Sequence, residues 1–194
     1  MRSIVLASSS RYRRELLARL HAPFVVDRPD VDESARPGES PAATAVRLAQ
    51  IKAEAVAPRH SGALVIGSDQ VADLDGMPIG KPGAFDAALD QLQRMQGRTV
   101  IFHTAVALLD TRTGALAADN VPTRVRFRTL SIETLETYLR LETPFDCAGA
   151  AKIEAAGIAL VESVESTDPT ALIGLPLIRL TTLLRASGVV VPPP

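Results

Sequence analysis

Cysteine, aromatic residues and long apolar runs are scarce in this sequence, and each scarcity excludes a class of protein. Cys147 has no second cysteine to pair with in the 194 residues, so a disulfide scaffold is excluded and a reducing compartment is favoured. With no Trp, two Tyr and five Phe, the chain lacks the stacking surface of single-strand nucleic acid binders. No apolar run approaches the roughly 20 residues needed to cross a bilayer. A net charge of only -1 argues against a protein that coats nucleic acid or an anionic membrane. Together with the single cysteine and the lack of a membrane-spanning run, it leads us to expect a cytoplasmic protein.

Apolar runs and helical patterns alternate along the whole chain. The apolar runs predict strands at 4–7, 24–26, 63–67, 99–109, 115–127 and 156–164, and Asp75-Gly76 predicts a hairpin within 71–79. Amphipathic spacing with Ser or Pro start signals predicts helices at 11–20, 41–57, 85–95, 132–141 and 176–186. This alternation is too irregular for a doubly wound sheet, so we expect α/β architecture with a mixed sheet. A Pro-rich tail at about 189–194 is expected to be loose.

The candidate phosphate-binding residues are hydroxyl and cationic side chains. Ser8-Ser9-Ser10 follows the first predicted strand, and arginines crowd the helix after it. Serine oxygens cap helices, and the free amides at a helix start also suit a phosphate, so a capped surface helix and an anion site explain these residues equally well. Lys52 and Lys81 are either salt-bridged or in contact with phosphate. A P-loop at 76–82 is excluded by its glycine spacing and by Pro82, which replaces the metal-binding Ser or Thr.

Among the acidic residues, Asp69 is singled out by its position. It follows the apolar strand predicted at 63–67, so we expect it at the tip of that strand, as a cap, or as a metal ligand or base at the mouth of a cleft. Mg²⁺ prefers one or two carboxylates plus phosphate oxygens, and Glu33 with Asp69 would form such a pair. The three scattered histidines support neither a zinc site nor a Ser-His-Asp triad. Cys147 is interpreted as a small buried residue.

Several short motifs occur in a characteristic order. They are Leu6-Ala7-Ser8-Ser9-Ser10 with Arg13, Val31-Asp32-Glu33, Leu48-Ala49-Gln50-x-Lys52-Ala53, Gly67-Ser68-Asp69-Gln70-Val71, Gly80-Lys81-Pro82, Thr104-Ala105, Asp146-Cys147-Ala148-Gly149 and Ile173-Gly174-Leu175-Pro176. Each motif is weak by itself, but their shared order and spacing make a strong match. On these motifs the chain resembles the Maf family of nucleoside triphosphate pyrophosphatases along almost its whole length.

Within that family the chain is most similar to the branch that acts on 7-methyl-GTP. The sister branch, which acts on dTTP and UTP, typically has Arg at the position of Tyr12, Thr at that of Gln70 and Gln at that of Glu154. N7-methylation makes guanine cationic, and a cationic ring favours the aromatic face of Tyr12 and the carboxylate of Glu154. The sequence departs from the family pattern at Arg11, where many relatives have Pro, and at Ala150-Ala151, which replaces Ser and an aromatic residue.

The resemblance also implies a fold and an assembly. It implies a single domain over 1–194, with a mixed, curved central sheet, helices on both sides and two lobes around a cleft, as in Maf and ITPase proteins. Homodimers are common in the family, so a homodimer is expected here. The expected partner is otherwise a small-molecule nucleotide.

The implied reaction is hydrolysis between the α- and β-phosphates, which yields a nucleoside monophosphate and pyrophosphate. Asp69 is expected to act as the catalytic base, and Glu33 and Asp69 to share a divalent metal cation, Mg²⁺ or Mn²⁺. The expected phosphate-binding residues are Ser8, Ser10, Arg13, Lys52 and Lys81, and the expected specificity residues are Tyr12, Gln70 and Glu154. Two alternatives stay open: the dTTP/UTP specificity of the sister branch, and a nucleotide-binding regulator of cell division.

Overall fold

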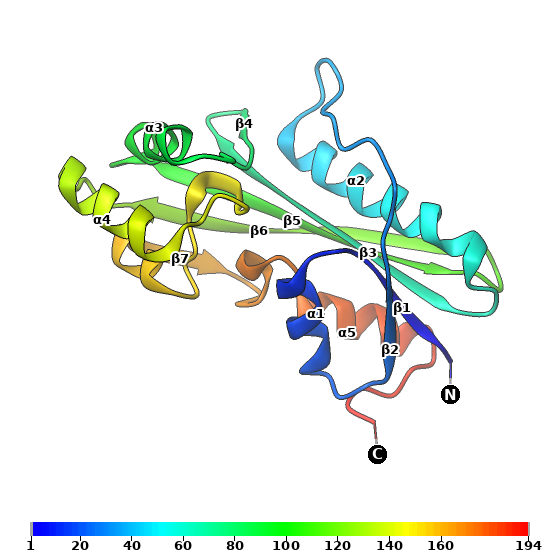
Figure 1. Cartoon of the computed structure of the whole chain (residues 1–194). Coiled ribbons are helices and arrows are strands. Elements are labelled where there is room, and N and C mark those ends of the chain that lie inside the picture. The colour runs from blue at the N-terminus through cyan, green and yellow to red at the C-terminus, as the bar shows by residue number, and fades with distance from the viewer. Residues whose placement is uncertain (1, 194) are drawn as a thin grey trace.

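The computed structural model describes residues 2–193, which form one mixed sheet with helices on both faces (Figure 1). The strands are β1 (Ile4–Ala7), β2 (Phe24–Asp27), β3 (Leu64–Leu74), β4 (Met77–Ile79), β5 (Thr99–Asp110), β6 (Leu116–Phe127) and β7 (Val161–Ser166). Their order across the sheet is β2-β1-β3-β5-β6-β7, and β4 pairs with β3. β1 runs parallel to both of its neighbours, whereas every other pair is antiparallel. The expected mixed α/β architecture is therefore confirmed.

The described part of the chain also contains five α-helices and four short 3-10 helices, and polar start signals explain where several of the α-helices begin. The α-helices are α1 (Arg11–Ala18), α2 (Pro41–Val56), α3 (Phe85–Met95), α4 (Ile132–Glu142) and α5 (Leu177–Ala186). The Ser40 hydroxyl caps α2 by accepting a hydrogen bond from the Ala43 amide at 3.2 Å, and Ser131 caps α4 in the same way. Pro41 occupies the first turn of α2, where its missing N–H costs nothing. Within residues 2–193, no helix is long and apolar enough to cross a membrane.

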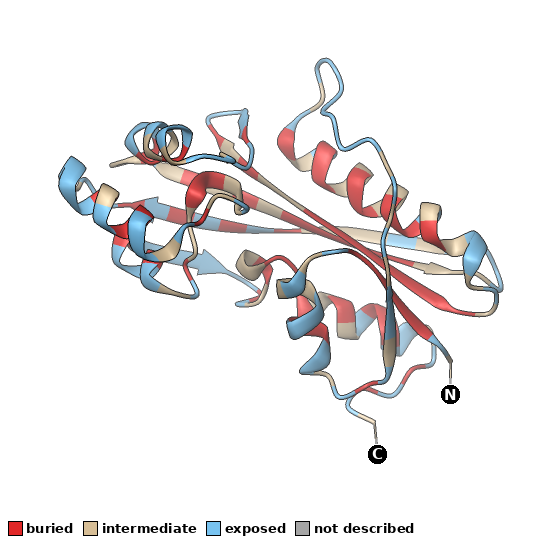
Figure 2. Cartoon of the chain, viewed as in Figure 1, coloured by how far each residue is buried: buried red, intermediate tan, exposed pale blue. Residues whose placement is uncertain are grey.

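The two faces of the sheet are covered differently (Figures 1 and 2). On one face α2 packs on the short apolar residues of the strands, including Val65 and Ala105. On the opposite face α1 and α5 form one buried cluster around Ile66, and α3 and α4 form another around Phe102. Polar residues of β3 and β5 lie between these two clusters. The cavity described below lies at the edge of β3 beside these polar residues and is lined from both faces of the sheet.

β3 is longer than the sequence predicted, and this changes the position of Asp69. The apolar run ends at Gly67, but the strand continues to Leu74 because β5 pairs with it from Leu64 through Asp73. The prediction that Asp69 lies at the tip of a strand is therefore wrong, since it lies in the middle of β3. Backbone pairing with β5 outweighs the low strand propensity of the polar residues that follow Gly67.

Two further segments differ from their predicted form. The strand predicted at 156–164 begins only at Val161, and a 3-10 helix precedes it. The Gly157 amide donates to the Lys152 carbonyl at 3.0 Å, so a local turn replaces pairing with a neighbouring strand there. The tail predicted to be loose is packed over its first part, where Val189 and Val191 are buried. The guanidinium of Arg185 also donates a hydrogen bond to the Val191 carbonyl at 2.8 Å. The last residue of that tail, 194, lies outside the described residues.

Candidate active site

The site is built on an opening in one edge of the sheet. β1 pairs with β3 only as far as Gly67, and β4 pairs with β3 only from Ala72 onward. Between these points the described chain places no strand along this edge of β3. From Gly67 to Ala72 there are five residue steps along β3, and at about 3.3 Å per step the opening is about 16 Å wide. The chain leaves β1 and β4 at the two sides of this opening, so the turn after β1 and the loop after β4 face each other across it.

A cavity of about 890 Å³ lies at this opening. Every site residue predicted from the sequence lines it: Ser8, Ser10, Tyr12, Arg13, Glu33, Lys52, Asp69, Gln70, Lys81 and Glu154. These residues come from the turn after β1, the start of α1, the loop before α2, α2 itself, β3, the loop after β4 and the segment before β7. The structure thus brings all ten residues to one place.

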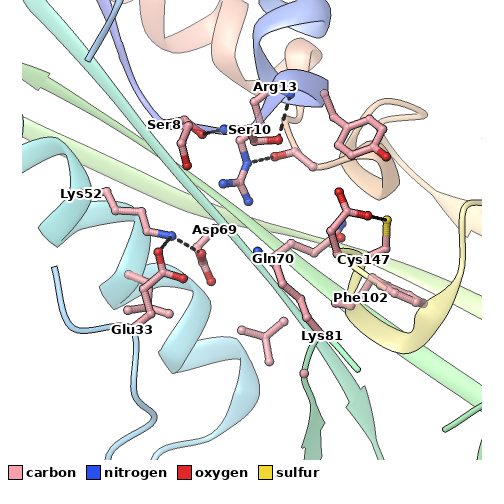
Figure 3. A pocket seen from close by; sticks show the side chains of 18 of the residues that line it. Ser8, Ser10, Arg13, Glu33, Lys52, Asp69, Gln70, Lys81, Phe102 and Cys147 are labelled. Atoms are coloured by element: carbon pink, nitrogen blue, oxygen red, sulfur yellow. Dashed lines mark hydrogen bonds and ion pairs between the residues drawn. The ribbon is translucent and has the colours of Figure 1, made fainter. Parts of the chain in front are cut away.

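Lys52 holds two carboxylates together in the wall of the cavity, as Figure 3 shows. Its Nζ lies 2.6 Å from Oδ1 of Asp69 and 2.8 Å from Oε1 of Glu33. Lys52 and Asp69 are buried, whereas Glu33 reaches them from an exposed loop. Burial opposes ionisation of Glu33, but the hydrogen bond from Lys52 and the positive charges of Lys52, Lys81 and Arg13 outweigh it and lower the pKa of Glu33.

Gly67 brings Lys52 onto Asp69. A Cβ at Gly67 would overlap the carbonyl oxygen of Ala49 and lie 2.9 Å from the amide nitrogen of Ala53, so only glycine lets α2 lie directly on β3. Lys52 is one helical turn beyond Ala49 on α2. Because side chains alternate along a strand, Asp69 lies on the same face of the sheet as Gly67. The close contact between helix and strand therefore places the ammonium against the carboxylate.

The turn after β1 is ordered by its own hydroxyl groups. The Ser8 Oγ accepts a hydrogen bond from the Ser10 amide at 3.1 Å, and the Ser10 Oγ caps α1 by accepting one from the Arg13 amide at 3.4 Å. The Arg13 Nε donates to the carbonyl of Gly174 at 2.8 Å, which holds its guanidinium at the cavity. Burial lowers the pKa of Arg13, although the charges of Asp69 and Glu33 oppose this. The same turn therefore caps α1 through Ser10 and places the positive charge of Arg13 in the wall of the cavity.

Gln70 and Ser68 bind the segment that carries Gly174. The Gln70 Nε2 donates to the carbonyls of Ala171 and Leu172 at 3.1 and 3.0 Å. The buried Ser68 Oγ lies 2.9 Å from the Gly174 carbonyl oxygen. In the sequence Ser68 appeared as a member of the motif Gly67-Ser68-Asp69-Gln70-Val71, without a role of its own. The structure shows that it fixes the same carbonyl that Arg13 binds.

The far end of the cavity is aromatic and acidic. The Arg11 guanidinium lies 4.7 Å from the centre of the Tyr12 ring, and its Nη2 donates to the Tyr12 hydroxyl at 2.8 Å. Loss of surrounding water raises the pKa of Glu154, and the charges of Glu142 and Asp146 act in the same direction. This end therefore already holds one cation against an aromatic face, with carboxyl groups in the same wall.

Three residues of this wall were not assigned to the site from sequence. Asp146, Cys147 and Phe102 all line the cavity. Cys147 is only half-buried, not enclosed as predicted, and burial raises the pKa of its thiol to about 11. The thiol is therefore neutral near pH 7 and lacks the thiolate that a nucleophile requires. The motif Asp146-Cys147-Ala148-Gly149 was the only signal that could have placed this segment at the site.

The donor set suits a divalent cation whose coordination a substrate completes. Residues 2–193 contain no cluster of three or more His, Cys, Asp or Glu that would bind a metal ion unaided. Glu33 and Asp69 nevertheless meet at Lys52, which takes one oxygen of each and leaves each a second oxygen. Mg²⁺ is typically bound by one or two carboxylates together with phosphate oxygens. The two acids therefore fit a metal ion that arrives with a phosphorylated ligand.

A protein family, curated proteins and a solved structure are similar to this chain. Residues 3–187 match the family model described as Maf-like protein. The 7-methyl-GTP pyrophosphatase of Cupriavidus metallidurans is 61% identical over 96% of this chain and 94% of its own, and that of Aromatoleum aromaticum is 59% identical over 97% of both chains. Among solved structures, the Ham1 protein of Staphylococcus aureus is similar over 65% of this chain and 72% of its own, with a TM-score of 0.48 and 17% sequence identity.

Proposed function

Because this chain belongs to the Maf family, we propose that it is a nucleotide pyrophosphatase that hydrolyses 7-methyl-GTP to 7-methyl-GMP and pyrophosphate. The observation that carries the proposal is the group of Asp69, Lys52 and Glu33 at the opening in the sheet. Acids that hold a nucleophile and a metal ion, and cations that hold a polyphosphate, are the two requirements of phosphoryl chemistry. The names of the relatives support the choice of substrate.

In the proposed reaction, water attacks the α-phosphorus, and its oxygen becomes part of the nucleoside monophosphate. The bond between the α-phosphorus and the oxygen that bridges to the β-phosphorus breaks, and pyrophosphate leaves with that oxygen. Asp69 orients the water and accepts its proton, which it can do from a fixed place in the middle of β3. Lys52, Arg13 and Lys81 neutralise the charge that collects on the phosphate oxygens. The hydroxyl groups of Ser8 and Ser10 complete the phosphate-binding turn.

Glu33 and Asp69 are also proposed to bind a divalent cation, Mg²⁺ or Mn²⁺. Such an ion neutralises phosphate oxygens and makes a water molecule more acidic. The exposed loop position of Glu33 lets its carboxylate meet a cation that arrives with the substrate. Lys52 holds the two acids in place until that cation is bound.

The preference for a methylated base is proposed to come from the far end of the cavity. The guanidinium of Arg11 over the Tyr12 ring supports this idea, because it is a planar cation against the same aromatic side chain. The cationic 7-methylguanine ring would take a comparable place, with Glu154 as an acceptor for its N–H groups. Gln70 ties β3 to the carbonyls of Ala171 and Leu172, and this contact is proposed to hold the adjoining wall of the cavity in place beside the base.

The substrate is tested with purified protein and a panel of 7-methyl-GTP, GTP, dTTP and UTP, with Mg²⁺, Mn²⁺ or a chelator. We expect pyrophosphate release to be fastest with 7-methyl-GTP and to require the metal. Highest kcat/KM for dTTP or UTP would instead assign the chain to the sister branch. Binding without release of pyrophosphate from any nucleotide would favour a nucleotide-binding regulator. We also propose that the protein is a homodimer and that it acts in the cytoplasm. Light scattering of the purified protein measures its mass in solution and so tests the homodimer.

Tyr12→Arg is expected to lose the preference for 7-methyl-GTP. A guanidinium at position 12 repels a cationic base, so the ratio of kcat/KM for 7-methyl-GTP to that for UTP should fall by about tenfold or more, which corresponds to about 1.4 kcal/mol. The measurement is steady-state kinetics on both substrates. Tyr12→Phe is the matched control: it keeps the ring, loses only the hydroxyl that Arg11 binds, and should keep the preference. An unchanged ratio in Tyr12→Arg would remove Tyr12 from the explanation of specificity.

A further inference from the structure

Arg47 of α2 makes a forked ion pair with Glu39 just before the helix begins. Its Nε lies 2.6 Å from Oε1 of Glu39, and its Nη2 lies 2.6 Å from Oε2. The Thr44 hydroxyl donates to the same Oε2 at 2.9 Å. The Arg47 and Glu39 side chains are only 14% and 13% exposed, so this pair is far better enclosed than an ordinary surface ion pair.

The same guanidinium also holds the loop that carries Glu33. The Arg47 Nη2 donates to the backbone carbonyl of Ser34 at 3.0 Å, one residue beyond Glu33. Residues 28–40, here called the Glu33 loop, connect β2 to α2. Arg47 therefore ties both Ser34 and Glu39 of this loop to the helix that carries Lys52.

Glu33 needs such an anchor because its ion pair with Lys52 is a weak constraint on an exposed side chain. Its side chain is 55% exposed, and Lys52 is its ion-pair partner within the described chain. Ordering an exposed backbone segment costs conformational entropy at every residue, and one ion pair offsets little of that cost. The Arg47 guanidinium lowers the pKa of Glu39 to about 2, so the anchoring pair stays charged at any ordinary assay pH.

We propose that Arg47 is a positioning residue for the metal site: by binding Ser34 and Glu39, it holds the Glu33 carboxylate beside Asp69 and so sets the affinity of the two acids for a divalent cation. This inference rests on the proposed function, which assigns a metal ion to Glu33 and Asp69. Arginine suits the role because its planar fork binds a carboxylate with two parallel hydrogen bonds and has further N–H groups for a carbonyl. A lysine at the same place is a single point donor and cannot make this set of contacts.

The test compares wild type, Arg47→Met and Arg47→Lys in two measurements. Hydrogen–deuterium exchange of the metal-free protein reads the order of the Glu33 loop, and we expect exchange in 29–36 to be at least about tenfold faster in Arg47→Met. Mn²⁺ titration of pyrophosphate release at saturating 7-methyl-GTP reads the metal site. We expect the half-maximal Mn²⁺ concentration to rise by about tenfold, with kcat at saturating Mn²⁺ within about threefold of wild type. Arg47→Lys should lie between wild type and Arg47→Met.

Arg2→Met is the matched control. Arg2 forms a similar forked pair with Asp110, at 2.6 and 2.5 Å and with side chains 18% and 17% exposed, but neither residue lines the cavity. Its loss should change neither loop exchange nor the Mn²⁺ requirement. The proposal is overturned if the Mn²⁺ requirement of Arg47→Met matches wild type, or if the wild-type enzyme needs no divalent cation. Wild type that releases no pyrophosphate would refute the proposed function, whereas loop exchange would still report whether Arg47 anchors the loop.

Discussion

Asp69→Asn is expected to lower kcat for pyrophosphate release by at least about 100-fold while leaving the fold intact. The amide cannot accept the proton of the attacking water, and it is a poorer ligand for a divalent cation. Its oxygen still accepts a hydrogen bond from Lys52, and Glu33 still balances the charge of that lysine, so the helix-to-strand contact should survive. Steady-state kinetics with 7-methyl-GTP gives kcat, and thermal unfolding reports the fold.

Asp73→Asn is the matched control for that result. Asp73 lies on β3 and on the same face of the sheet as Asp69, but it faces His103, with its Oδ2 3.4 Å from Nε2, and does not line the cavity. Its loss should leave kcat within about threefold of wild type. Comparable kcat values for the Asp69 variant and wild type would show that this carboxylate is not the base.

Gly67→Ala is expected to destabilise the protein by about 3 kcal/mol, at the upper end of the usual cost of overpacking. The added methyl group meets backbone atoms of Ala49 and Ala53, which cannot rotate away as the end of a long side chain would. α2 must therefore move off β3, and Lys52 moves with it, away from Asp69. Urea unfolding measures the free energy of unfolding, and kcat/KM should fall together with it.

Gly80→Ala separates this effect from the general cost of replacing a glycine. A Cβ at Gly80 meets nothing within 4 Å, and the residue is exposed, so the free energy of unfolding should change by less than about 0.5 kcal/mol. If Gly67→Ala were equally harmless, the direct contact of α2 with β3 would not be what places Lys52.

The sequence was informative where a local pattern decides the structure. Ser40 with Pro41, and Ser131, marked the starts of α2 and α4 correctly because caps depend on atoms only three residues away. Asp75-Gly76 marked the β3–β4 hairpin, since both residues adopt positive φ values. The motifs also predicted which side chains would converge on the cavity, and the structure places all ten there.

Features that depend on distant partners could not be predicted in this way. The length of β3 follows from its pairing with β5, and no feature of Asp69 itself signals that pairing. The contact between Glu33 and Lys52 depends on the path of an exposed loop. Arg47 holds that path by a hydrogen bond to the backbone carbonyl of Ser34, and every residue has such a carbonyl, so the sequence does not reveal this contact. Gly67 appeared in a motif, but the sequence did not show why glycine is required at this position. The requirement comes from the close contact with α2, which only the three-dimensional structure shows.

β1 and β4 leave part of the edge of β3 unpaired, and this arrangement has a consequence for how the substrate specificity of such a protein can change. The lengths of β1 and β4 set the width of this opening. Lengthening either strand by one residue would narrow it by about 3.3 Å, whatever side chains are present. Exchanges such as those at position 12 leave the span untouched and alter only what is recognised inside it. The width of the opening and the chemistry of the recognised base therefore depend on different features of the protein. A change in strand length alters the first, and a side-chain substitution alters the second.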